Sequence, residues 1–403
     1  MSAFVYTWIL YQPLILRVDF ANKDTLVFKF TKSQSHGGHI TATSCKPDYT
    51  AAFKSDWGDK DTTLWPCIRL VGEKASQGKK HEDQERQAIL CLYYLLLARP
   101  DLHVAQGLFT SKSNIVFLFG IGGVGIRTFS VEWGNAELHR LMYAFFYRLY
   151  DPGDFADSSY VEMVPNLEES TVTYNVQIHL GNGMDRNPMM VTNLRPLYAS
   201  NPFASRTHIL SNPNSKVKVN GKPLTVLKDQ LCRIGTCFDE HNILTAVHSP
   251  ETVPGIVEAV HNEVIKIPRD FCSSREKHRL GLRQVGKPLT SIPTVAQMLE
   301  IVFDTLEGKL SFIIRILYTH NFAVLRYLRF ERHVLHRDIS KGNILYVDDN
   351  LSSSVGSQSG GGNKMLGPEG LPLCFINYVL GKRCVEMLHF WANTIVTLNQ
   401  QRS

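Results

Sequence analysis

The sequence has few cysteines, and none of them shows the spacing of metal-binding cysteines. Its 403 residues contain eight cysteines, with no Cys-x-x-Cys pair and no Cys/His cluster at zinc-finger spacing. A chain of this length is expected to form two or three domains, each with its own core. A small zinc or disulfide scaffold is therefore excluded, and we expect reduced, mostly buried thiols in an intracellular protein.

Charge and long apolar runs are also scarce. Charged residues make up 20% of the chain and hydrophobic residues 44%, whereas disordered proteins show high charge and low hydrophobicity. The net charge of +6 is spread along the sequence, which makes a nucleic-acid partner unlikely on composition alone. No stretch approaches the roughly 18 uncharged apolar residues of a membrane span. The N-terminus lacks the basic segment of a secretory signal. We therefore predict neither a membrane span nor a signal peptide.

The N-terminal part of the sequence shows a compact α+β pattern. This pattern predicts an N-terminal module with a connector over residues 40–190. A strongly apolar helix is expected at 84–98, where it stops before Pro100. Two strands at 114–119 and 126–131 surround a glycine turn, and a helix follows at 136–150. Residues 151–200 carry strand-like pieces broken by Pro and Gly, which is typical of a connecting region.

A second domain is expected over residues 195–403. Asn220-Gly221 predicts a hairpin turn, and Leu224, Val226 and Lys228 alternate on one face of the following strand. The remaining elements are expected as helices at 233–248 and 295–330, short strands at 334–335 and 344–347, and a flexible Ser/Gly-rich insertion at 348–370.

The strongest chemical signal is the octet from His336 to Asn343, which reads HRDISKGN and has the spacing HRDxxxxN. Phosphoryl transfer from ATP needs a carboxylate that accepts the proton of the attacking hydroxyl, and an oxygen ligand that holds Mg²⁺. Asp338 and Asn343 meet these needs on a loop between two short strands. The alternative is a surface loop in which Asp338 caps a turn, which is how isolated HRD triplets usually arise.

The octet and several other segments resemble the fungal-type protein kinase domain. The further pieces are KPD at 46–48, VLKD at 226–229, Glu-x-x-Ile-Leu at 240–244 and HRLGLRQVGKPLTSI at 278–292. Together they extend over most of residues 40–380. The resemblance implies an α+β, bilobal protein-kinase-like fold that binds ATP and Mg²⁺ and phosphorylates Ser or Thr of an unknown protein substrate.

Lys228 is the candidate lysine for the ATP phosphates. Glu240 shares an apolar helix face with Ile243, Leu244 and Val247, and a carboxylate on such a face needs a partner. Lys228 on the neighbouring strand supplies one, which matches the strand-lysine to helix-glutamate pair of kinases. Asp239 competes for the acidic role, and a solvated lysine at the end of a strand is the simpler alternative.

Three departures from the kinase pattern predict weak or lost activity. The family pattern would place glycines near Ala204 and Arg206, in the loop that covers the phosphates. Asn377 stands where the second metal carboxylate is usual, so that Mg²⁺ would lose an anionic ligand. No Ala-Pro-Glu segment follows, which predicts an incomplete C-terminal lobe. A catalytically inactive pseudokinase or scaffold protein is therefore the alternative function.

Two weaker motifs are interpreted as structural. Residues 120–125 spell GxGxxG, but they lead into a strand-like segment instead of a helix, so we interpret them as a hairpin turn. Asp48 and the Glu73-Lys74 pair resemble the acids of PD-(D/E)xK nucleases, although the E-x-K spacing is absent. We interpret these acids as part of a small α+β domain.

Overall fold

The fold was analysed in a computed structural model. It describes residues 25–30, 45–56, 63–76, 81–180, 187–235, 240–249, 256–268, 271–272, 274–288, 292, 294, 344–346 and 374–376. The chain forms two compact units. The first comprises residues 1–212, 227–234 and 263–279, and the second comprises 213–226, 235–262 and 280–403.

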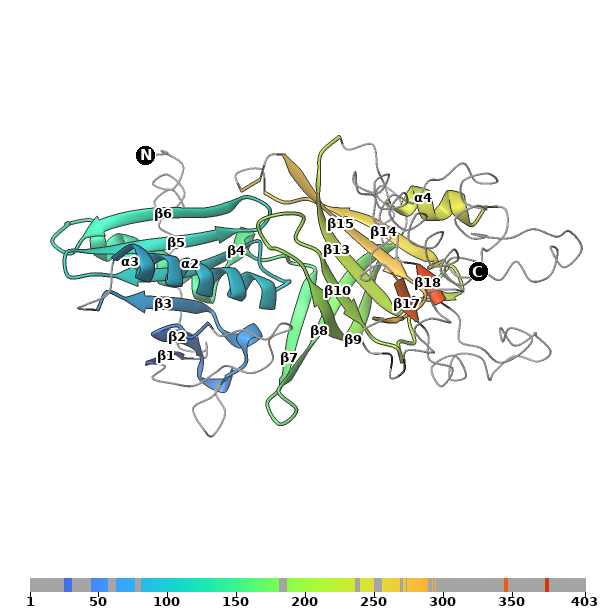
Figure 1. The fold of residues 1–403 in the computed structure, drawn as a ribbon, viewed down its shortest axis with the longest axis horizontal. Coiled ribbons are helices and arrows are strands. Elements are labelled where there is room, and N and C mark those ends of the chain that lie inside the picture. The colour runs from blue at the N-terminus through green and yellow to red at the C-terminus, as the bar shows by residue number, and fades with distance from the viewer. Residues whose placement is uncertain are drawn as a thin grey trace, which may run out of the picture. The chain divides into compact units, whose positions relative to one another are not determined.

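A six-stranded sheet forms the N-terminal part of the first unit (Figure 1). The strands follow one another in chain order, and each pair is antiparallel except β3 and β4, which are parallel. Parallel neighbours need a crossover connection, and helix α2 (His81–Ala98) provides it. The strands are β1 (Leu26–Phe30), β2 (Tyr49–Phe53), β3 (Leu70–Lys74), β4 (Val104–Thr110), β5 (Asn114–Ile121) and β6 (Gly125–Glu132).

Two apolar clusters pack against opposite faces of this sheet. Phe117 on β5 joins the cluster of helix α3 (Leu138–Tyr150), where its ring lies 5.0 Å from that of Phe145. Leu118, the next residue, joins the cluster of α2 together with Leu95. Successive strand residues point to opposite faces, so one strand contributes to both cores. The predicted helices and the glycine-turn hairpin are confirmed in this region.

A seven-stranded sheet follows, with the order β14-β15-β13-β10-β9-β8-β7. The expected connector at 151–200 contributes three of its strands, so that interpretation was wrong. Pro165, Pro188 and Pro196 lie within these strands, and proline in a sequence usually argues against a strand. The strands are β7 (Tyr160–Asn166), β8 (Thr171–Leu180), β9 (Asn187–Ala199), β10 (His208–Ser211), β13 (Val226–Arg233), β14 (Ala259–Ile265) and β15 (Arg275–Leu282).

The second unit contains short elements. The predicted turn at Asn220-Gly221 is confirmed: both residues have positive φ, 51° and 77°, as a type I′ hairpin turn requires, between β11 (Lys218–Val219) and β12 (Lys222–Pro223). Helix α4 (Glu240–Val247) is shorter than the predicted helix at 233–248, because Arg233 belongs to β13. A three-stranded sheet has the order β16 (Lys287–Pro288), β17 (Ile344–Tyr346) and β18 (Cys374–Ile376).

The predicted fold class, an α+β bilobal kinase-like domain with a helical C-terminal lobe, is wrong. Among the described residues 47% lie in strands and 21% in helices, and the large sheets are mostly antiparallel. Three α-helices occur in this part of the chain. The expected helix at 295–330 lies outside the described residues. The strand content was underestimated because strands of alternating apolar and polar residues resemble loops when prolines interrupt them.

The expectation of reduced cysteines is wrong for one pair. Cys45 and Cys91 form a disulfide with their Cα atoms 5.8 Å apart, which joins the segment before β2 to helix α2. Cys67 and Cys272 are buried free thiols. Among the described helices, none is both long and apolar enough to span a membrane.

Candidate functional site

The predicted catalytic aspartate and metal ligands, Asp338, Asn343 and Asn377, lie outside the described residues. The strands beside two of them are described. β17 begins directly after Asn343 and β18 ends directly before Asn377, and the two strands pair antiparallel with Ile344 opposite Ile376. The predicted strand before the insertion is therefore present, and it pairs with a strand after the insertion, although 27 residues of sequence (347–373) separate them.

Lys228, the predicted phosphate-binding lysine, lies in the middle of β13. Only 3% of its surface is exposed, so it is not the solvated strand-end lysine of the simpler alternative. Glu240 is the first residue of α4 and is half-buried. Lys228 and Glu240 belong to different compact units, so their pairing stays a prediction. Asp239, the competing acid, lies outside the described residues.

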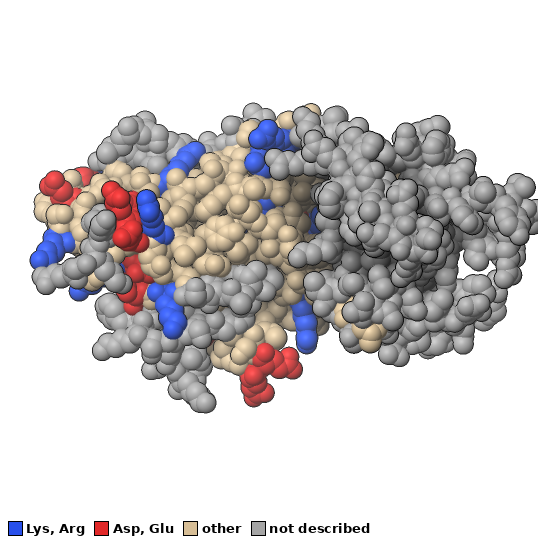
Figure 2. All heavy atoms as spheres, in the orientation of Figure 1, with Lys and Arg blue, Asp and Glu red and all other residues tan. Residues whose placement is uncertain are grey.

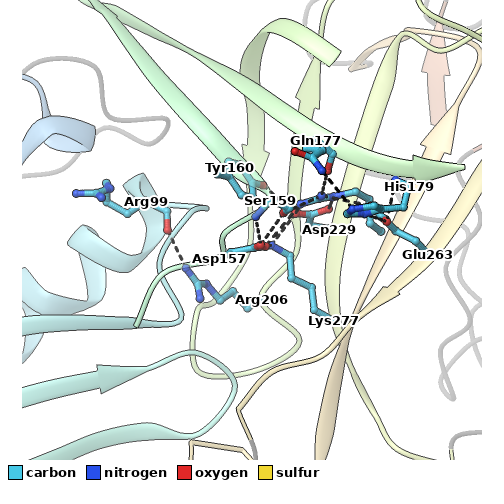
Figure 3. A network of polar contacts seen from close by, with 11 residues as sticks. Arg99, Asp157, Ser159, Tyr160, Gln177, His179, Arg206, Asp229, Glu263 and Lys277 are labelled. Carbon is cyan, nitrogen blue, oxygen red and sulfur yellow. Dashed lines mark hydrogen bonds and ion pairs between the residues drawn. The ribbon is translucent and has the colours of Figure 1, made fainter. Parts of the chain in front are cut away.

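Asp229, the neighbour of Lys228, enters a buried ionic network that the sequence did not predict (Figure 3). Arg279 on β15 donates two hydrogen bonds of 2.8 Å to its carboxylate. The ammonium group of Lys277 lies 2.7 Å from Asp229 and 2.5 Å from Asp157. Successive strand residues point to opposite faces, so the network holds one face of β13 while the Lys228 side chain points to the other face.

Two further side chains complete the network. Tyr160 donates a hydrogen bond of 2.8 Å to Asp229, and its ring lies 4.8 Å from the Lys277 ammonium. Glu263 on β14 lies 3.4 Å from Arg279 and 3.3 Å from the ring of His179. The network thus contains three acidic and two basic side chains that form ion pairs with one another. Buried charges are stable only when they are paired in this way.

The two aspartates of the network are held in their ionised form. Burial alone would raise the pKa of Asp229, but Arg279 and Lys277 hold it well below the usual aspartate range. Burial likewise opposes ionisation of Asp157, and the same two cations lower its pKa far below the ordinary value. Carboxylates that stay ionised at all ordinary pH values exchange no proton near neutrality. The network therefore serves to fix β13, and with it the position of Lys228.

The predicted phosphate-covering segment, residues 202–210, contains no glycine and overlaps the loop between β9 and β10 (residues 200–207). Arg206 has a left-handed backbone with φ of 36° and is buried, with 5% of its surface exposed. Its guanidinium donates hydrogen bonds to the carbonyls of Arg99, at 2.8 Å, and of Leu96, at 3.5 Å. These carbonyls lie at the C-terminal end of helix α2, where a cation interacts favourably with the helix dipole. This loop is therefore attached to the N-terminal sheet and its helices.

The two motifs interpreted as structural have structural roles. Gly123 has a positive φ of 74° in the turn between β5 and β6, and Gly125, the first residue of β6, has a φ of 131°. This geometry confirms the hairpin interpretation of GxGxxG. Asp48 accepts a hydrogen bond of 2.8 Å from the backbone N–H of Lys74. No group of three or more potential metal-ligating side chains occurs in the part of the chain that the structure describes.

Figure 2 shows the charged residues on one face of the described surface. Lysine and arginine residues there are scattered and partly interleaved with acidic residues, with wide uncharged areas between them. A scan of the chain against models of known protein families finds no match, and a search of curated proteins finds none either. The kinase-type site is thus a hypothesis that rests on the residues of this chain.

Proposed function

We propose that the chain binds ATP with Mg²⁺ at a protein-kinase-type site, and that transfer of phosphate to Ser or Thr of a protein substrate is weak or lost. The observation that carries the proposal is the pairing of β17 with β18. This pairing links the strand that follows the HRDxxxxN octet to the strand that precedes Asn377.

The register of this pair explains how distant residues can form one site. Ile344 is matched with Ile376 in an antiparallel pair. The strand that follows Asn343 in the sequence therefore lies beside the strand that precedes Asn377. Asn343 and Asn377 are the predicted metal ligands, and they are 34 positions apart in the sequence.

The burial of Lys228 supports the nucleotide part of the proposal. A buried ammonium group is stable only beside anionic or hydrogen-bonding groups. Its strand is fixed on the opposite face by the Asp229 network, which keeps the lysine in one place, as a phosphate contact requires. In the proposed site, Lys228 contacts the phosphates, Glu240 orients Lys228, and Asp338 accepts the proton of the substrate hydroxyl. When bound, Mg²⁺ would neutralise phosphate charge.

The same residues argue for weak transfer. Asn377 offers a neutral amide oxygen where an anionic ligand would attract Mg²⁺ more strongly. The β9–β10 loop, which would cover the phosphates, has Arg206 in place of a glycine and is hydrogen-bonded to the end of α2. These two features favour the second candidate function, a non-catalytic scaffold protein of pseudokinase type.

Nucleotide binding is tested by calorimetric titration of the full chain with MgATP. Lys228→Met should weaken binding about tenfold or more, because a charge-assisted contact to phosphate is lost. Lys218→Met is the matched control, since Lys218 is an exposed strand lysine and should bind as wild type does. Equal binding by all three proteins would refute the assignment of Lys228, and absence of binding in wild type would refute the proposed function. Urea unfolding of each variant checks that the fold persists.

A phosphate-transfer assay separates the two candidate functions. Wild type, Asp338→Ala and Asn377→Asp are incubated with radiolabelled ATP and a generic Ser/Thr protein substrate. Transfer that is measurable in wild type, absent in Asp338→Ala and raised in Asn377→Asp supports a weak kinase. MgATP binding without transfer in all three proteins supports the scaffold.

An intracellular location is part of the proposal, and the Cys45–Cys91 disulfide argues against it, because disulfides persist mainly in oxidising compartments. Thiol titration of the unfolded protein, isolated under conditions that block exchange, decides between the two. Eight free thiols support the intracellular location, and six support an oxidising compartment.

A further inference from the structure

The Cys45–Cys91 disulfide lies inside the apolar cluster that surrounds helix α2. Cys45 exposes 4% of its surface and Cys91 exposes 0%. The bond joins the segment before β2 to the middle of α2, and the two cysteines are 46 positions apart in the sequence. It therefore closes a loop that contains β2 and β3. Closure of a long loop restricts the unfolded chain, so the bond stabilises this part of the sheet.

Two polar side chains contact the sulfur atoms. Nε2 of Gln87, one turn before Cys91 on the helix, lies 3.9 Å from Sγ of Cys45 and 3.8 Å from Sγ of Cys91. Oε1 of Glu73 on β3 lies 3.6 Å from Sγ of Cys91. Glu73 is buried, with 5% of its surface exposed, so this contact is shielded from bulk water.

The two contacts respond differently to the redox state of the cysteine pair. A sulfur atom accepts a weak hydrogen bond from the Gln87 amide whether or not it belongs to a disulfide. An ionised carboxylate can only accept a hydrogen bond, and a disulfide sulfur has no hydrogen to donate. The thiol of a reduced Cys91 has one, at hydrogen-bond distance from Glu73. Reduction therefore adds a hydrogen bond to a charged acceptor, which favours the dithiol form.

The fold around the pair does not depend on the disulfide alone. Asp48 accepts a hydrogen bond of 2.8 Å from the backbone N–H of Lys74. The hydroxyl of Tyr49 donates a hydrogen bond of 3.4 Å to the carbonyl of Leu108. β2 also pairs with β1 and β3. These contacts hold the segment after Cys45 in place when the sulfurs separate, so both redox forms keep the same fold.

We infer that Cys45 and Cys91 form a reversible thiol–disulfide switch, which Glu73 biases toward the reduced form and which sets the stability of the six-stranded sheet. Two molecules of a low-molecular-weight thiol such as glutathione reduce the bond. They supply two electrons and two protons: the S–S bond breaks, each cysteine sulfur takes up one hydrogen, and the reductant is oxidised to its own disulfide. Lys46, next to Cys45, is exposed, so a brief opening of this end of the loop gives the reagent access to Cys45. The inference does not depend on the proposed nucleotide site.

The test equilibrates the folded full chain in glutathione buffers that range from fully reduced to fully oxidised. Free thiols are trapped by alkylation, and mass spectrometry of the peptides that contain Cys45 and Cys91 gives the fraction of disulfide. We expect the pair to pass from dithiol to disulfide within this range. In Glu73→Gln the equilibrium constant for disulfide formation should rise about three- to tenfold, because an amide can also donate to a disulfide sulfur. The matched control is Glu82→Gln, an exposed acid in the first turn of α2, which should match wild type.

Thermal unfolding measures the consequence for stability. Oxidised wild type should melt about 5–10 °C above reduced wild type, because the disulfide constrains the unfolded chain. Cys45→Ser cannot form the bond, so it should melt at the temperature of reduced wild type in both buffers. This variant separates the effect of the Cys45–Cys91 bond from the effect of the other cysteines.

Three results would contradict the switch. A pair that stays oxidised in excess reduced glutathione, or reduced in excess oxidised glutathione, would overturn it. Loss of the folded state on reduction, seen by circular dichroism, would overturn it as well. Equal equilibria in wild type and Glu73→Gln would overturn the bias that we assign to Glu73. If Glu73→Gln fails to fold, wild type and Cys45→Ser still decide whether the switch exists.

Discussion

The two large sheets of this protein are stabilised in different ways. The six-stranded sheet buries apolar side chains on both faces, against α2 on one side and α3 on the other. The β13–β15 part of the seven-stranded sheet instead buries a network of three acids and two bases around Asp229 and Arg279. Hydrophobic burial is non-directional, whereas buried ion pairs are stable only in one precise geometry.

This difference teaches where the molecule tolerates change. An apolar core loses stability in proportion to the volume removed, and its remaining contacts persist. Removal of one member of an ionic core costs more stability than the lost contact alone, because the partner is left charged and buried. The strand that carries Lys228 belongs to the second kind, so its position depends on residues that never touch a ligand.

The largest expected effect is the loss of Arg279. Arg279→Met leaves Asp229 without its two hydrogen bonds and should lower the free energy of unfolding by about 3–5 kcal/mol. The measurement is urea unfolding followed by circular dichroism. Arg195→Ala is the control, because its 3.8 Å contact with Glu169 is exposed and should be worth less than about 1 kcal/mol. Equal effects of the two variants would contradict a special role for the ionic core.

The apolar core is probed by Leu95→Ala on helix α2. Leu95 is fully buried, so its truncation should cost about 3 kcal/mol through lost burial and the remaining cavity. The same truncation at Leu90, which is 41% exposed on the same helix, should cost well under about 1 kcal/mol. The loss of stability in Leu95→Ala should not depend on pH between 6 and 8. A strong pH dependence would show that the apolar and ionic cores are energetically coupled.

Acid should destabilise the protein through two buried histidines near the network. Burial, opposed by Asp157 and supported by Lys277, lowers the pKa of His103 to about 4. Burial and Arg206 lower the pKa of His208 to about 3. Below pH 6.5 the unfolded chain binds protons at these residues that the folded chain does not, so stability falls as the pH falls.

The expected loss is about 2 kcal/mol for each histidine between pH 6.5 and pH 5, at roughly 1.4 kcal/mol per pKa unit. Chemical unfolding at pH 5, 6 and 7 measures it. His208→Gln should reduce the pH dependence, while the exposed His139→Gln should keep it. Below about pH 4 the lowered pKa values of Asp157 and Asp229 act in the same direction, because the unfolded carboxylates bind protons first. A stability that is flat from pH 7 to pH 5 would contradict the buried neutral histidines.

The smallest expected effect distinguishes two glycines in the β5–β6 turn. Gly125→Ala should cost about 1 kcal/mol, because the residue has a φ of 131° but open space around it. Gly122 has no positive φ, but a Cβ atom there would displace Arg206. Gly122→Ala should therefore lower stability and also speed up hydrogen exchange at 203–207. Thermal unfolding and hydrogen exchange of both variants separate backbone strain from the lost contact.

Local structure was largely predictable where the hydrophobic pattern was undisturbed. The helix that ends before Pro100, the hairpin around GxGxxG and the Asn220-Gly221 turn all depend on neighbouring residues, and all are confirmed. The strand-like pieces at 151–200 were interpreted as a connecting region and not as part of a sheet, because their prolines and bulges resemble loop punctuation. Their pairing partners, which compensate for these irregularities, are distant in the sequence.

The buried network was not predictable for a related reason. In the segment REKHRLGL, Lys277 and Arg279 alternate with other polar residues, which is the pattern of a solvated strand face. Only acids from other parts of the chain make that face an interior one: Asp157 before β7, Asp229 on β13 and Glu263 on β14. The VLKD segment contained a weak signal, because Asp229 follows Lys228 on a strand that is otherwise apolar.

The sequence by itself determined the local elements, the kinase-like octet with Asp338 and Asn343, and the choice of Lys228 as a candidate residue. Residue identity and short-range spacing are sufficient for such inferences. Tertiary structure alone decided that the protein is built on large antiparallel sheets, that Lys228 lies opposite a buried ionic network, and that Arg206 joins the β9–β10 loop to helix α2. These features arise from contacts between residues 50 to 120 positions apart, and the energy of such contacts depends on geometry that no local pattern specifies.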